Sequence, residues 1–102
     1  MGKVIERYVI PVTNSGKFVL EVPKGSDVHD FGIEDNDFSI WFACPRDVIS
    51  ENRYFRLAGM DEHIDAPDGY HFELIGRFEV DRAEWTQLLY EVKASDLSKS
   101  LV

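Results

Sequence analysis

Apolar and polar residues alternate along most of this chain in short runs that turn-forming residues separate. Such a period of two places successive side chains on opposite faces of a β-strand. Clusters of Gly, Pro, Asn and Asp interrupt the runs every ten residues or so, which is typical of an all-β fold. The pattern therefore predicts a single small antiparallel sandwich or barrel of about seven strands. The predicted strands cover residues 3–12, 17–22, 27–33, 38–44, 52–59, 70–79 and 84–93.

The last of these segments fits two structures. Trp85, Leu88 and Val92 have the spacing of one helix face, and residues 81–84 read as a helix capping box. The same segment, 84–93, also alternates with a period of two. Its periodicity alone leaves both a strand and a helix open.

Length and composition bound the rest of the fold. A chain of 102 residues with 44% hydrophobic residues suits one domain with a packed core. We expect residues 1–93 to form this β domain and residues 94–102, which are polar, to form a flexible tail. The single cysteine, Cys44, excludes an internal disulfide and fits a reducing compartment. We find no signal peptide and no apolar run long enough to span a bilayer, so we expect a cytoplasmic protein.

The charge is strongly acidic and uneven. The sequence holds 19 Asp and Glu against 11 Lys and Arg, a net charge of −8, which argues against direct binding to nucleic acid or an anionic membrane. Residues 27–37 and 61–73 each carry five acidic residues and no Lys or Arg. If the strands form an up-and-down meander, these two segments meet at one end. The acidic end would then comprise Asp30, Glu34, Asp35, Asp37, Asp61, Glu62, Asp65 and Asp68.

This acidic end has two interpretations. It is either a solvated surface that keeps the protein soluble, or a surface that binds a basic partner protein. The segment around His63 also gathers potential metal ligands, but their spacing matches neither an EF-hand loop nor an HExxH zinc site. No nucleophile motif or phosphate-binding glycine loop is present. We therefore predict no catalytic residue, no metal site and no cofactor.

Several short motifs resemble, in order, those of a family of short proteins encoded by bacteriophages and prophages. Residues 7–12 resemble a K/R-Y-x-I-P-V start, and residues 51–59 resemble an E-x-R-x-F-x-V-x-G segment. The resemblance implies a small all-β fold without an assigned activity, and it favours a strand over residues 84–93. It also implies that Tyr8, Trp41 and Phe55 are core aromatic residues. The chain departs from the family pattern at residues 59–61 and 76–77.

These observations predict a non-enzymatic, phage-type accessory protein that acts by binding another protein in the host cytoplasm. One alternative is an acidic inhibitor that mimics nucleic acid and occupies a basic groove on a host protein. Another is a minor component of the virion. The sequence is compatible with either a monomer or a homodimer, because exposed edge strands can pair two copies.

Overall fold

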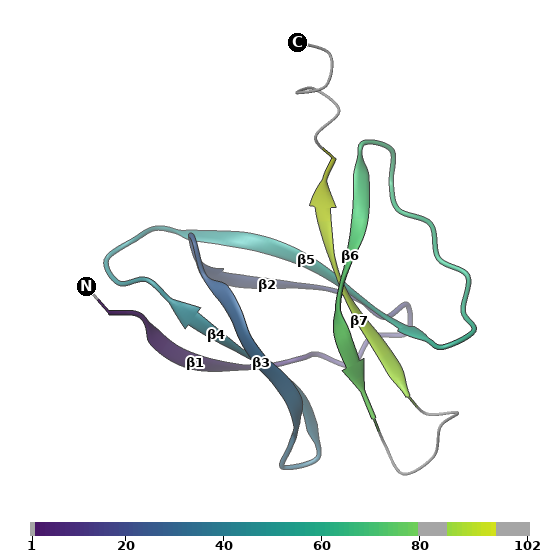
Figure 1. The fold of residues 1–102 in the computed structure, drawn as a ribbon, viewed down its shortest axis with the longest axis horizontal. Helices are drawn as coiled ribbons and strands as arrows, with labels where there is room; N and C mark the ends of the chain where they lie inside the picture. The colour runs from purple at the N-terminus through teal and green to yellow at the C-terminus, as the bar shows by residue number, and fades with distance from the viewer. Residues whose placement is uncertain (1, 80–85, 96–102) are drawn as a thin grey trace.

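The computed structural model describes residues 2–79 and 86–95, which form an all-β fold of seven strands without a helix (Figure 1). The fold class predicted from the alternation is thereby confirmed. The strand bounds agree with the predicted ranges to within three residues at every end. The strands are β1 (Val4–Val9), β2 (Lys17–Pro23), β3 (Asp27–Glu34), β4 (Asp37–Cys44), β5 (Ser50–Gly59), β6 (Tyr70–Phe78) and β7 (Gln87–Ala94).

The seven strands form two antiparallel sheets that pack as a sandwich. Sheet A has the order β1-β4-β3, and sheet B has the order β2-β5-β7-β6. Only β3 with β4 and β6 with β7 are both consecutive in sequence and paired in a sheet. The up-and-down meander assumed for the acidic segments is therefore wrong, because most connections pass between the sheets or skip a strand.

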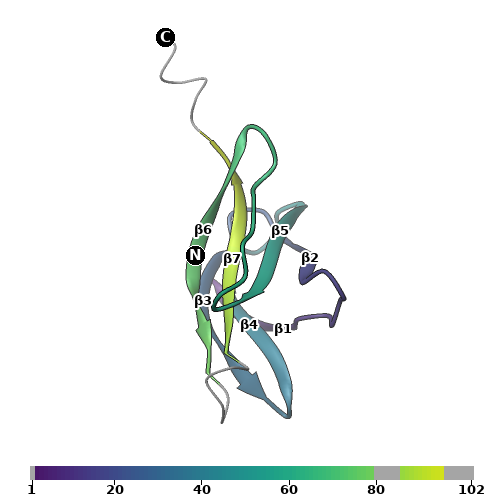
Figure 2. The same cartoon turned by 90° about the vertical axis from the view of Figure 1, so that its right-hand side faces the viewer.

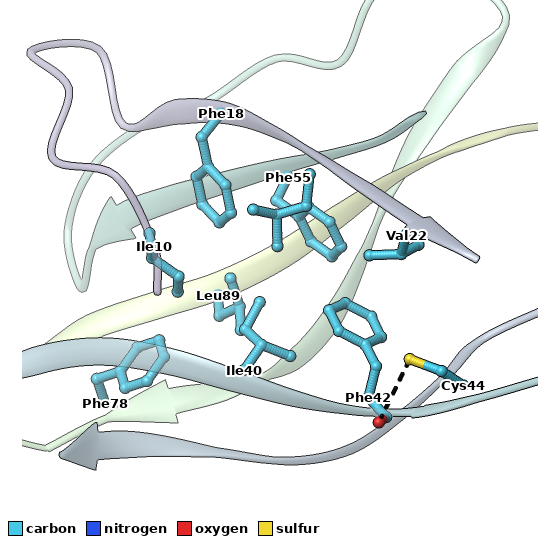
Figure 3. Packing of buried hydrophobic residues seen from close by; sticks show 10 residues of the cluster. Ile10, Phe18, Val22, Ile40, Phe42, Cys44, Phe55, Phe78 and Leu89 are labelled. Carbon is cyan, nitrogen blue, oxygen red and sulfur yellow. Dashed lines mark hydrogen bonds between the residues drawn. The ribbon is translucent and has the colours of Figure 1, made fainter. Parts of the chain in front are cut away.

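The core lies between the inner faces of the two sheets (Figure 3). Phe18 and Phe55 stack across neighbouring strands of sheet B with ring centroids 5.3 Å apart. Phe42 of sheet A meets Phe55 edge-on at 6.2 Å, so aromatic contacts join the two layers. The buried cluster comprises Ile10, Phe18, Leu20, Val22, Ile40, Phe42, Cys44, Phe55, Phe78 and Leu89.

Two of the three predicted core aromatic residues contact the core. Phe55 is fully buried, and Tyr8 packs edge-on against Phe42 at 5.4 Å. Trp41 is only half-buried and lies on the outer face of sheet A, where its ring passes over Gly32. The prediction that Trp41 is a core aromatic residue is wrong. Sheet A has core on its inner face alone, and β4 is central only within its sheet.

The ambiguous C-terminal segment is a strand where the structure describes it. Residues 87–94 pair with both β5 and β6, which places β7 inside sheet B and excludes the helical alternative for these residues. The capping-box residues 81–84 and the tail residues 96–102 lie outside the described residues. Ser95, which was assigned to the tail, donates its backbone N–H to the Gly69 carbonyl at 2.9 Å.

Two local features shape sheet A and its contact with sheet B. The β3–β4 connection is a two-residue hairpin turn in which Asp35 and Asn36 both have positive φ, as a type I′ turn requires. Four residues before this turn, Phe31 of β3 packs directly over Gly76 of β6, where a β-bulge interrupts the strand. A Cβ atom at position 76 would overlap the Phe31 ring, so only glycine permits this close approach.

Candidate functional site

The connection between β5 and β6 runs from one end of sheet B to the other. Both strands pair antiparallel with β7, so they are parallel to each other, and residues 60–69 must return from one end of the sheet to the other. Figure 1 and Figure 2 show this segment leaving the end of β5 and rising to the start of β6. We call residues 60–69 the crossover loop.

The crossover loop changes the picture of the acidic end. In both views the β3–β4 turn lies at the lower edge of the molecule, whereas the loop climbs away from it (Figure 1, Figure 2). Asp61 follows the end of β5, and Asp68 precedes the start of β6 at the other end of sheet B. The predicted acidic residues are therefore spread along the molecule and do not share one end.

Several of these predicted residues have local partners. Glu34 forms an ion pair with Arg7 at 3.2 Å, and Asp30 accepts a hydrogen bond from the Phe31 backbone N–H at 2.8 Å. Asp65 lies 3.4 Å from His63 in the crossover loop. Asp35 and Asp37 sit at the β3–β4 turn, and Asp61 and Asp68 at the two ends of the loop. Among residues 2–79 and 86–95, no three His, Cys, Asp or Glu side chains are arranged to hold a metal ion.

Glu62 anchors the start of the crossover loop to sheet B. Its carboxylate accepts a hydrogen bond from the Arg56 guanidinium and another from the Gly59 backbone N–H, the second at 3.1 Å. Its own backbone N–H donates to the Gly59 carbonyl at 3.2 Å. The outer face of β5 is covered at this point, since Ala58 on that face is only 1% exposed. Glu62 thus holds the start of the crossover loop against β5, and its role as a partner-binding acid stays a prediction.

A groove of about 700 Å³ lies between the crossover loop and the outer face of sheet B. Its floor is an apolar row that crosses all four strands, because the strand register places Val19, Tyr54, Val92 and Phe72 side by side. The loop supplies the facing wall. The groove is lined by Lys17, Phe18, Val19, Tyr54, Phe55, Arg56, His63, Ile64, Asp65, Pro67, Tyr70, Phe72 and Val92.

The next row of the same face begins with two cations. Lys17 of β2 is directly opposite Arg56 of β5, and like charges in such positions repel each other. Arg56 pairs with Glu62, whereas Lys17 has no ion-pair partner in the described part of the chain. The Arg56 Nε atom is buried and has no hydrogen-bond partner among the described residues. This end of the groove is therefore a cationic spot in an acidic protein.

A second cleft, of about 440 Å³, opens between β3 and the β6–β7 edge of sheet B. Its base is an ion pair in which Arg53 donates to both Glu91 oxygens, at 2.7 and 2.8 Å. Arg53 also donates to the Ser26 carbonyl and lies 5.3 Å above the Phe42 ring. Nearby, Lys93 pairs with Glu73 at 3.2 Å. Through Arg53 this cleft links the two sheets. Because its charged side chains are paired with one another, it offers a ligand fewer free groups than the groove does.

The contact with Glu91 raises the pKa of the Arg53 guanidinium, although burial acts in the opposite direction. Arg53 therefore stays charged at any pH that the protein meets, and Glu91, which is 5% exposed, supplies its counter-ion on the inner face of sheet B. Sequence reasoning placed Arg53 in a family motif but did not find this pairing, since 38 positions separate the two residues.

In comparisons with known proteins, no family model, no curated protein and no solved structure matched this chain. The resemblance to phage-encoded proteins therefore stays a prediction. Within the described residues, no helix is long and apolar enough to cross a bilayer.

Proposed function

We propose that this protein is a non-catalytic binding protein that holds an extended segment of a partner protein in the groove between the crossover loop and sheet B. The observation that carries the proposal is the apolar row across the groove floor, which projects from the sheet face that the core does not use. Val19 and Tyr54 in this row are 47% and 56% exposed. Exposed apolar side chains gathered in a groove are typical of protein-binding surfaces.

The form of the groove supports a peptide as its occupant. Its volume suits a few side chains, and its walls combine aromatic rings with a small number of polar groups. The tyrosines Tyr54 and Tyr70 add rigid, amphipathic contact area, which is favoured at protein interfaces. The family resemblance supplies the setting that we propose, an accessory protein of phage type that acts in the cytoplasm of a bacterial host.

The mimicry alternative needs acidic side chains gathered on one surface. The crossover separates Asp61 from Asp68, and Glu62 is bound to Arg56, so the geometry gives this alternative no support. The alternative of a minor virion component has no specific feature in its favour. Both remain predictions, and the experiment below separates the acidic alternative from the proposal.

The experiment compares variants of two faces. Val19→Ser/Tyr54→Ser removes apolar area from the groove. Ile5→Ser/Val9→Ser removes it from the outer face of sheet A, where both residues are 46% exposed, and serves as the matched control. All four side chains are exposed, so both variants should fold, which circular dichroism will check. Bacterial proteins captured by the parent are identified by mass spectrometry, purified and measured again by calorimetry.

We expect the groove variant to weaken the measured affinity roughly tenfold or more, because buried aromatic anchors dominate such interfaces. The control variant should bind as the parent does. A partner that binds the groove variant normally would overturn the proposal. If binding instead fails in Asp61→Asn/Asp68→Asn, which leaves Glu62 and the groove residue Asp65 intact, the acidic-mimic alternative replaces it.

A further inference from the structure

We infer that the groove takes a peptide in which an apolar side chain and a carboxylate are separated by one residue. This inference rests on the proposed function and adds the chemistry of the ligand. It follows from two neighbouring rows on the outer face of sheet B, one apolar and one cationic. The apolar row is Val19, Tyr54, Val92 and Phe72, and the next begins with Lys17 and Arg56.

The spacing of the two rows fixes the spacing in the ligand. Tyr54 and Arg56 are two residues apart on β5, which places them about 7 Å apart along the strand. An extended peptide has the same repeat, so its side chains i and i+2 project toward the sheet at the same separation. If the ligand side chain at position i lies over Tyr54, its side chain at position i+2 therefore lies over Arg56 and Lys17.

The charge of the second row determines what that side chain is. Lys17 and Arg56 face each other directly, and only Arg56 has a carboxylate partner in the described chain, Glu62. The carboxylate of Glu62 is already used by Arg56 and the Gly59 N–H, and that of Asp65 lies beside His63. A carboxylate from the ligand would relieve the repulsion between the two cations and pair with the Lys17 ammonium.

Arg56 contributes positive charge to this row but no free contact. Its guanidinium donates to Glu62, and its Nε atom is buried, so a ligand in the groove does not reach that atom. Lys17 is exposed and has no ion-pair partner among the described residues, so it is the group that the ligand carboxylate contacts.

The test uses two peptides that differ in one group, acetyl-Phe-Ala-Glu-amide and acetyl-Phe-Ala-Gln-amide. Each is titrated into the ¹⁵N-labelled full chain, and amide shifts give the affinity and the place of binding. Lys17→Gln removes the proposed contact. Lys24→Gln, an exposed lysine in the β2–β3 turn, makes the same change in net charge away from the groove and is the control.

We expect the Glu peptide to shift the amides around Val19 and Tyr54 and to bind roughly fivefold more tightly than the Gln peptide. Lys17→Gln should abolish this preference, and Lys24→Gln should keep it. Equal binding of the two peptides by the parent overturns the acidic specificity but leaves the groove as a binding site. Binding of neither peptide overturns the inference, whereas the proposed function itself fails only if the groove variant binds its partner normally.

Discussion

The ion pair between Arg53 and Glu91 allows a stability prediction that can be worked out from the structure. The two side chains are 15% and 7% exposed, and they share two hydrogen bonds of 2.7 and 2.8 Å. Removing one member leaves the other as a buried, uncompensated charge, which costs about 3 kcal/mol. We therefore expect Glu91→Leu and Arg53→Met each to lower the free energy of unfolding by about 3 kcal/mol.

The double variant Arg53→Met/Glu91→Leu should be more stable than either single variant. It buries no unpaired charge, and Met keeps much of the Arg53 contact with the Phe42 ring. Its remaining loss is the hydrogen bond to the Ser26 carbonyl, worth about 1 kcal/mol. We expect the double variant to lie about 2 kcal/mol above each single variant.

Urea denaturation at neutral pH, followed by circular dichroism, measures all four proteins under the same conditions. Non-additivity in this cycle is the decisive quantity, because it isolates the interaction between the two side chains. If the two single losses simply add in the double variant, the pair contributes no coupling and the reasoning is refuted. Single losses below about 0.5 kcal/mol would show that water screens the pair, as it does at an exposed surface.

Three further predictions concern packing and ionisation. Gly76→Ala should destabilise the protein by about 1–3 kcal/mol, because the methyl group overlaps Phe31, and Phe31→Leu should restore part of the loss in the same urea assay. Burial raises the pKa of Tyr8 from 10.0 to about 12. The free energy of unfolding should therefore decline as the pH rises from 10 toward 12, because the unfolded chain loses this proton first. Tyr8→Phe should remove the last step of the phenolate absorbance titration. The hydrogen bond from Lys3 lowers the pKa of Asp27 below 3.8. The stability that this contact adds is therefore present above pH 3.8 and is lost as the pH falls through the pKa of Asp27 in the folded protein. Lys3→Gln should return the Asp27 carboxyl titration, followed by NMR, to its usual range.

The positions of the strands could be predicted from the sequence because alternation is a local signal. Residues 17–22 show this directly, with every second side chain buried in β2. Residues 38–44 are apolar at nearly every position, so their sequence does not show which face turns to the core, and for that reason Trp41 was misplaced. Ser39, two residues earlier on the same outer face, is fully buried because Arg7 from β1 covers it and donates to its hydroxyl at 3.0 Å.

The order of the strands in the sheets could not be predicted from the sequence, and the candidate site depends on that order. The sequence pattern cannot show that β7 pairs between β5 and β6, so it could not predict that residues 60–69 cross a sheet. The alternation of their own segments places Val19 and Tyr54 on the face opposite Phe18 and Phe55. Nothing in their own segments shows that the register aligns them, or that a loop forms a wall beside them.

The most direct test of the account is to ask which face of the protein touches its partner. A photoreactive benzoylphenylalanine is introduced in place of Tyr54 in the groove or in place of Ile5 on the outer face of sheet A, and each protein is irradiated with the purified partner. We predict a covalent adduct from position 54 and none from position 5. An adduct from position 5 alone, or equal adducts from both positions, would contradict the assignment of the groove as the binding surface.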